Sequence, residues 1–256
     1  MGFFDFLASE PPYSQEPLSV LRLNRRHGFL IAPFTETIRG ARVLDLAAHD
    51  GRWSLAFAAA GACEVVGIEG RAELVARFAR WRHVPGHERV SLRRGDIFAA
   101  LEEMVAEGTH FDIVALFGIL YHVMDHMRLM LLVRALAPRL VIVDGEFLCR
   151  PGPVIGLVRE RTDNPLNAMP QYPGQKVALK GVPSFPAFER IAEAAGFAVE
   201  WQDWSVLEKG RRQGVRDYFR PGDMRRASCT LRPLEERVRM PSPRRRAPVI
   251  RADRPP

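Results

Sequence analysis

The sequence has few cysteines, and they do not pair at any metal-binding spacing. Its 256 residues contain three, Cys63, Cys149 and Cys229, which are odd in number and far apart. Such a set does not build a disulfide framework, and it lacks the paired spacing of a zinc site. We therefore expect a protein of a reducing, cytoplasmic compartment with no structural metal.

Long hydrophobic runs are also missing. No segment reaches the roughly 18 uninterrupted apolar residues of a membrane span. The first residues, MGFFDFLASEPP, combine a very short apolar run with an acidic residue and no basic leader, which is not the pattern of a signal peptide. With 47% hydrophobic residues the chain can bury one sizeable core, so we expect a soluble protein with no membrane partner.

Net positive charge is low outside the last residues. The formal net charge is +7, and residues 231–256 contribute most of it, with eight arginines against three acidic residues. The same stretch holds six prolines, a composition that predicts a disordered basic tail over 233–256. The tail is either a solvated segment or one that binds RNA or another acidic surface.

The body of the chain alternates apolar and helical patterns. Residues 1–38 predict a loose N-terminal arm, and a single domain is expected over 39–232. Strands are predicted at 41–47, 64–70, 90–96, 111–118 and 139–147, with helices between them. This alternation predicts an α/β fold, namely a doubly wound, mainly parallel sheet with helices on both faces.

The regular pattern stops at a proline-rich stretch. Residues 148–182 show no clear long periodicity, which favours an inserted loop or lid over the substrate site. A helix is expected next, at 184–196, with Ser184 as its N-cap. Two further strands, FAVEWQDWSVL and RRASCTLRPL, predict an antiparallel hairpin at the sheet edge, which completes seven strands.

Carboxylates recur at the ends of the predicted strands, where ligands bind in open α/β sheets. Asp45 lies near the end of the first, Glu69 ends the second, Asp96 ends the third, and Asp144 and Glu146 end the fifth. Glu69 follows the first loop by 18 residues, a spacing that suits the two hydroxyls of a ribose. Asp96 can accept the exocyclic amine of an adenine, with Ile97 against the ring. Since no P-loop lysine follows, the pattern indicates an adenosine ligand without a triphosphate.

On these residues the sequence resembles the class I S-adenosylmethionine-dependent methyltransferases. Their pattern is an apolar strand, Asp-x-Gly-x-Gly-x-Gly and an acidic end to the second strand, which VLDLAAHDG and GIEG match in part. The resemblance covers about residues 40–232. It implies S-adenosylmethionine as cofactor, S-adenosylhomocysteine as product, and no metal. It also places Trp53, Gly70 and Phe117 at the cofactor, although a tryptophan in the first turn of a helix suits a core position equally.

Within this family, GILYHVMDH and PSFPAFERIAEAAGF are similar to a branch that includes tRNA wobble-uridine carboxymethyltransferases and many natural-product methyltransferases. The cofactor loop departs from the family pattern, because Ala47 and His49 stand where the first two glycines belong and only Gly51 remains. Since Asn, Asp and His tolerate positive φ better than most residues, His49 or Asp50 is expected to take the left-handed turn. Ala47 would add only a methyl group beside the cofactor.

His122 is the expected catalytic residue. It follows the fourth strand, where an acceptor would enter, and a histidine side chain titrates near neutral pH, as a general base requires. A histidine that only packs there is the alternative. His122 and His126 have i, i+4 spacing, but one aspartate nearby does not complete a metal site.

Other side chains are expected around the acceptor, which the resemblance makes a small molecule methylated at oxygen or nitrogen. They are Tyr121, Arg26, Glu146, Arg161 and Tyr172. Arg26 belongs to the basic arm LRLNRRHGF, which either covers the cofactor and pairs with an acidic acceptor or forms a solvated basic face. An RNA acceptor and a non-catalytic S-adenosylmethionine-binding protein are the alternatives, and the sequence carries no signal for an oligomeric state.

Overall fold

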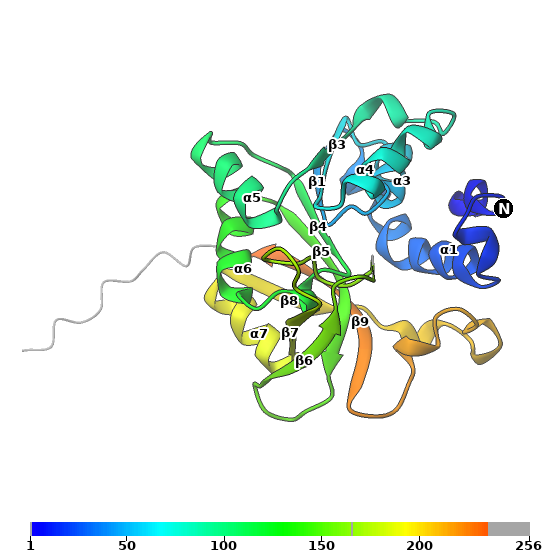
Figure 1. Cartoon of the computed structure of the whole chain (residues 1–256). Coiled ribbons are helices and arrows are strands. Elements are labelled where there is room, and N and C mark those ends of the chain that lie inside the picture. Colours follow the sequence, from blue (N-terminus) through cyan, green and yellow to red (C-terminus); the bar gives the residue numbers. More distant parts are fainter. Residues whose placement is uncertain (1, 165, 235–256) are drawn as a thin grey trace, which may run out of the picture.

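The computed structural model describes residues 2–164 and 166–234, and a seven-stranded sheet forms its centre (Figure 1). The strand order is β3-β2-β1-β4-β5-β9-β8. The bounds are β1 Arg42–Leu46, β2 Glu64–Glu69, β3 Val90–Arg94, β4 Ile113–Phe117, β5 Leu140–Leu148, β8 Phe197–Trp201 and β9 Met224–Pro233. The first five strands are parallel, and β9 runs antiparallel to both β5 and β8. The predicted doubly wound fold with its antiparallel hairpin is confirmed.

Helices cover both faces because successive residues of the buried strands point to opposite sides. Their bounds are α1 Ser19–Leu30, α2 Thr35–Ile38, α3 Arg52–Ala59, α4 Ala72–Arg77, α5 Ile97–Ala106, α6 His126–Ala135 and α7 Phe185–Ala194. Val43 and Ile113 belong to the core cluster under α1 and α3, whereas Leu44 and Val114 belong to the cluster under α5, α6 and α7. Within residues 2–164 and 166–234, no helix has the length and apolar character needed to cross a membrane.

The N-terminal residues, expected as a loose arm, fold into helices. Short 3-10 turns at Phe3–Leu7 and Tyr13–Gln15 precede α1. Phe4 and Leu7 are fully buried, which ties the arm to the core. The Tyr13 hydroxyl donates to the buried Asp50 carboxylate at 2.5 Å, so the arm also contacts the loop after β1.

The proline-rich insert contains a hairpin that we did not expect from its sequence. Strands β6 Ile155–Arg161 and β7 Val177–Pro183 pair antiparallel, and residues 162–176 connect them. The sequence does not reveal these strands because β6 is mostly exposed and neither strand alternates between apolar and polar residues. At the edge of the main sheet, β8 ends at Trp201 instead of continuing to Leu207, because a 3-10 turn begins at Trp204.

The basic tail and its RNA-binding interpretation lie almost entirely on residues 235–256, outside the described residues.

Candidate functional site

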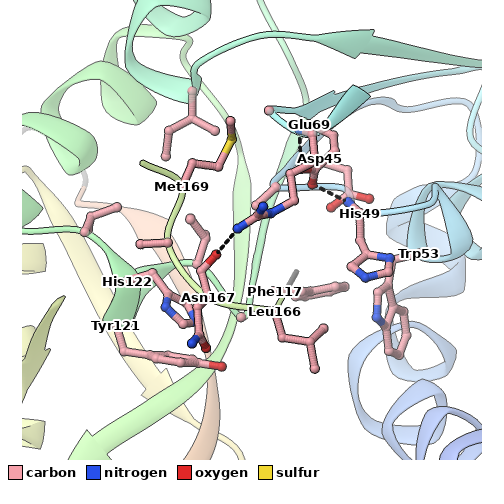
Figure 2. Close-up of a pocket in the computed structure, with 18 of the residues that line it drawn as sticks. Asp45, His49, Trp53, Glu69, Phe117, Tyr121, His122, Leu166, Asn167 and Met169 are labelled. Atoms are coloured by element: carbon pink, nitrogen blue, oxygen red, sulfur yellow. Dashed lines mark hydrogen bonds between the residues drawn. The ribbon is translucent and has the colours of Figure 1, made fainter. Parts of the chain in front are cut away.

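A cavity of about 1220 Å³ opens at the carboxyl ends of β1, β2, β3 and β4. Ligand pockets commonly measure roughly 300–1,000 Å³, so this one has room for a nucleoside and a second small molecule. Twelve of the residues proposed from the sequence line it: Arg26, Asp45, Ala47, His49, Trp53, Glu69, Gly70, Asp96, Ile97, Phe117, Tyr121 and His122. Figure 2 shows many of them, with the insert crossing in front of the strand ends.

The loop after β1 keeps the left-handed turns of a glycine-rich loop without the glycines. Ala47, His49 and Gly51 have φ values of 58°, 56° and 79°. These are the three positions that glycine occupies in the family pattern. We expected the left-handed conformation at His49 or Asp50; it lies at His49, and Ala47 shares it.

The remaining glycine is required by packing. A Cβ on Gly51 would lie 2.4 Å from the ring of Phe78, and the residue does not line the cavity. His49 is held by its neighbours, since its Nδ1 lies 2.6 Å from Nη1 of Arg52, which also contacts Asp50 at 2.8 Å. The loop is therefore braced by side chains where glycine is missing.

Asp45 is a buried carboxylate on the cavity wall. It is 1% exposed, and the Ser54 hydroxyl donates to it at 2.7 Å. Burial raises the pKa of Asp45 to about 7, and the bond from Ser54 opposes the shift. A cationic group beside it would favour the ionised form.

Glu69 joins two loops through its two oxygens. Oε2 accepts from the amide of His49 and Oε1 from the amide of Arg71, each at 2.9 Å. Burial raises the pKa of Glu69, while the amides of Arg71 and His49 lower it in part. Each oxygen has a further lone pair, so the carboxylate can still accept two hydroxyls.

Asp96 caps α5 and lines the cavity at the same time. Its Oδ1 accepts from the amides of Phe98 and Ala99, at 2.9 and 3.0 Å. The capping role alone accounts for an aspartate at this position. Its second oxygen makes no bond within the described residues, so it is free to accept from a ligand.

The insert closes one side of the cavity. Nη2 of Arg71 donates to the carbonyls of Thr162, Asn164 and Asn167, at 3.1 to 3.2 Å. Figure 2 shows Met169 on the Glu69 side of the cavity and Asn167 near His122 and Tyr121. These contacts anchor Thr162, Asn164 and Asn167 beside Arg71, which follows the carboxyl end of β2.

His122 pairs with a carboxylate that the sequence did not reveal. Its Nδ1 lies 2.7 Å from Oε1 of Glu160, a residue of β6, and both side chains are below 10% exposed. Burial raises the pKa of Glu160, but its hydrogen bonds to His122 and to the Ala168 amide hold it below its usual range. Lys180 lies 3.5 Å from the other oxygen.

No spacing in the sequence links His122 to Glu160, because 38 residues separate them and the hairpin brings them together. A His–carboxylate pair facing a cavity can hold the ring in one orientation and stabilise its protonated form. His126, by contrast, is buried, and its Nε2 lies 3.0 Å from the Gly181 carbonyl oxygen.

Four proposed residues lie away from the cavity. Gly51 packs on Phe78 as described, and Glu146, Arg161 and Tyr172 are also absent from the lining. Arg161 pairs with Asp163 at the surface, and Tyr172 is 62% exposed. Among the described residues, no group of three or more His, Cys, Asp and Glu side chains converges as a metal site would require.

Residues 43–139 match the model of a family described as a methyltransferase domain. No curated protein matches the chain. Among solved structures, one neighbour is the N-terminal domain of EvdMO1 in the presence of SAH and D-fucose, with 22% identity, a TM-score of 0.58, and coverage of 78% of this chain and 80% of that one.

Two more neighbours share the fold. An S-adenosylmethionine-dependent methyltransferase from Mesorhizobium loti has 18% identity, a TM-score of 0.53, and coverage of 77% and 96% of the two chains. The [4+2]-cyclase SpnF has 17% identity, a TM-score of 0.51, and coverage of 79% and 81%.

Residues 43–139 thus match a methyltransferase domain, and the sheet order shows a Rossmann-like fold that is shared with solved S-adenosylmethionine-dependent methyltransferases. The fold that the resemblance implied is thereby confirmed, and the family match agrees with the resemblance over residues 43–139. The narrower branch stays a prediction.

Proposed function

We propose that this protein transfers a methyl group from S-adenosylmethionine to an oxygen or nitrogen of a small-molecule acceptor. The observation that carries the proposal is one shared cavity, which holds Glu69 and Asp96 at one end and His122 at the other. Since the cyclase SpnF has a similar fold, fold alone does not define a reaction, and the proposal rests on this arrangement.

The residues present fit an adenosine-type sulfonium donor. Glu69 has lone pairs left for the ribose hydroxyls, and Asp96 has an oxygen left for the adenine amine. Asp45 would face the ammonium of the amino acid part. The left-handed turns at Ala47 and His49 turn the loop backbone as a glycine-rich loop does. When bound, the donor supplies an electrophilic methyl group on sulfur.

The chain itself orients the acceptor and takes its proton. His122 would accept the proton that a hydroxyl or amine loses as it is methylated, and Glu160 stabilises the imidazolium that results. Tyr121 lies beside His122, with ring centroids 4.3 Å apart, and forms the adjacent wall. The Arg71 contacts to the carbonyls of Thr162, Asn164 and Asn167 hold the insert at the donor end of the cavity.

The test is calorimetry with S-adenosylmethionine and S-adenosylhomocysteine, followed by turnover with a labelled methyl donor and candidate acceptors. Glu69→Ala should weaken binding by about tenfold or more, because it removes two charge-assisted hydrogen bonds to a ligand. Glu64→Ala, on the same strand but paired with Arg42 at its other end, is the matched control. Absence of binding by the wild-type protein would sink the proposal.

Two alternatives give different results in the same assays. A sensor would bind the donor and show no turnover with any acceptor. An RNA-modifying enzyme would retard RNA at low salt and lose activity when residues 241–256 are deleted. Retained activity on metabolites after that deletion favours the small-molecule acceptor.

A further inference from the structure

Two buried arginines share a single carboxylate at the acceptor side of the cavity. Arg26 of α1 and Arg226 of β9 both donate to Oδ2 of Asp144, Arg226 at 2.9 and 3.1 Å. Each arginine is 7% exposed and lines the cavity, whereas Asp144 is fully buried. The other oxygen of Asp144 accepts from Tyr218 and Ser228, at 2.6 and 2.9 Å.

This cluster has one positive charge more than it has negative charges. Burial raises the pKa of Asp144, but the two guanidinium groups hold it well below its usual range, so the carboxylate is ionised. Glu146 lies across the strands from Arg226, yet it makes no ion pair within 4.0 Å and does not line the cavity.

The neighbouring charges are already matched. Arg22, on the same helix as Arg26, pairs with Asp217 at 2.6 Å. Lys180 lies 3.5 Å from Glu160, which also holds His122. Within the described residues, the excess charge therefore stays on the two arginines around Asp144.

An unmatched charge in a buried place is costly unless an anion or water compensates it. Part of each guanidinium has no bond within the protein: Arg226 Nη1 reaches only the Tyr121 hydroxyl at 3.3 Å, and Arg26 Nη1 has no hydrogen bond among the described residues. Both arginines open on the cavity, so a ligand there can supply the missing negative charge.

The location of the two arginines indicates that they contact the methyl acceptor and not the methyl donor. Asp144 pairs in register with Phe117, at the carboxyl end of β4, and Arg226 lies one strand further from β1. Tyr121 bridges Arg226 to the His122 ring. The donor contacts proposed above lie on β1, β2 and β3, on the other side of β4.

We propose that Arg26 and Arg226 bind a carboxylate of the methyl acceptor, which makes the substrate a small carboxylic acid. The planar guanidinium groups suit a carboxylate, which accepts two parallel hydrogen bonds. A monoanion neutralises the cluster, whereas a phosphate dianion would overcompensate it. This inference rests on the proposed function only in naming the bound carboxylate as part of the methyl acceptor. Binding of an anion by the two arginines can be measured without turnover.

The experiment compares two probes of nearly equal shape, benzoate and benzamide, titrated into the protein saturated with S-adenosylhomocysteine. Benzoate should bind about tenfold more tightly than benzamide, a typical effect of pairing a charge in a buried site. In Arg226→Gln, which leaves Arg26 and Asp144 as a balanced pair, the preference should fall to about one. If Arg226→Gln does not fold, Arg26→Gln provides the same test, because it removes the other arginine that binds Asp144.

The matched control is Arg25→Gln, next to Arg26 on α1 but outside the cavity, where the side chain donates to the Gln213 carbonyl. This variant should keep the full preference for benzoate. A preference equal in wild type and Arg226→Gln, or none in wild type, overturns the proposal.

A second comparison tests whether the pair holds the donor's own carboxylate. S-adenosylhomocysteine carries an amino acid part that 5′-methylthioadenosine lacks. The measured quantity is the affinity for S-adenosylhomocysteine divided by that for 5′-methylthioadenosine. If Arg226→Gln lowers this ratio tenfold and leaves the affinity for benzoate unchanged, the arginines bind the donor and the proposal is wrong. If neither nucleoside binds, the proposed function fails, while the benzoate preference is still measurable in the ligand-free protein.

Discussion

Ala47, which has a left-handed backbone conformation in the loop after β1, should be replaceable by glycine with a gain in stability. An alanine-to-glycine substitution usually lowers stability. Ala47 has φ of 58°, a conformation that costs an L-residue with a Cβ about 1–2 kcal/mol and glycine nothing. Glycine also makes the unfolded chain more flexible, which costs about 0.4–1 kcal/mol. Ala47→Gly should therefore raise the free energy of unfolding by about 0.5–1 kcal/mol.

For a chain of this size, that gain corresponds to an increase in Tm of about 1–4 °C. The measurement is urea unfolding at 25 °C together with a thermal scan, on protein free of ligand. Binding of S-adenosylhomocysteine should change by less than about twofold, because the loop is already in the glycine-like conformation.

Two other alanines serve as controls. Ala137 is exposed and has φ of 55°, so Ala137→Gly should stabilise the protein by a similar amount without affecting the ligand. Ala48, between the two left-handed residues of the loop, is 2% exposed and lacks a positive φ, so Ala48→Gly should destabilise it. If Ala47→Gly lowers stability while Ala137→Gly raises it, the backbone argument for the loop is refuted.

Three further predictions concern the cavity. Burial raises the pKa of Asp45 to about 7, so a donor ammonium should bind better as Asp45 ionises. The affinity for S-adenosylhomocysteine should therefore rise from pH 5.5 to about 7 and then stay constant, and calorimetry below pH 7 should detect proton release on binding. Glu160→Gln should lower the methylation rate about tenfold or more and move the acidic limb of its pH profile to lower pH, with ligand affinity unchanged. Arg71→Ala should speed S-adenosylhomocysteine dissociation and proteolytic cleavage within 162–176, because three carbonyl contacts are lost.

Each of these has an outcome that contradicts it. Asp45→Asn should abolish the pH dependence and the proton release, so a variant that retains both would exclude Asp45 as their source. Equal rates for Glu160→Gln and wild type would remove Glu160 from the role of a positioning residue. The control variant is Arg77→Ala, at the end of α4. If proteolysis cleaves Arg71→Ala no faster than Arg77→Ala, the conformation of the insert does not depend on Arg71.

Helices and strands of the central domain were predictable because their signals are local. The strand predicted at 64–70 is observed at Glu64–Glu69, and the strand predicted at 111–118 is observed at Ile113–Phe117. The burial of β1, β2, β4 and β5 on both faces follows from their mainly apolar sequences. Parallel strands also end at one edge of a sheet, which is why Asp45, Glu69 and Asp96 were expected together and do line one cavity.

Two features depended on contacts that sequence patterns do not record. In the hairpin of β6 and β7, β6 is mostly exposed and neither strand shows apolar alternation, yet β6 carries Glu160 to His122. The left-handed conformation of Ala47 goes against the preference of alanine, and only the surrounding loop imposes it.

By itself, then, the sequence determined the class of fold, the edge of the sheet where the cavity opens and the acids that line it, because periodicity and strand ends are local features of the chain. Tertiary structure alone decided which distant charges meet. The pairing of Glu160 with His122, and the sharing of Asp144 by Arg26 and Arg226, follow from how the arm, the insert and β9 pack around the same cavity.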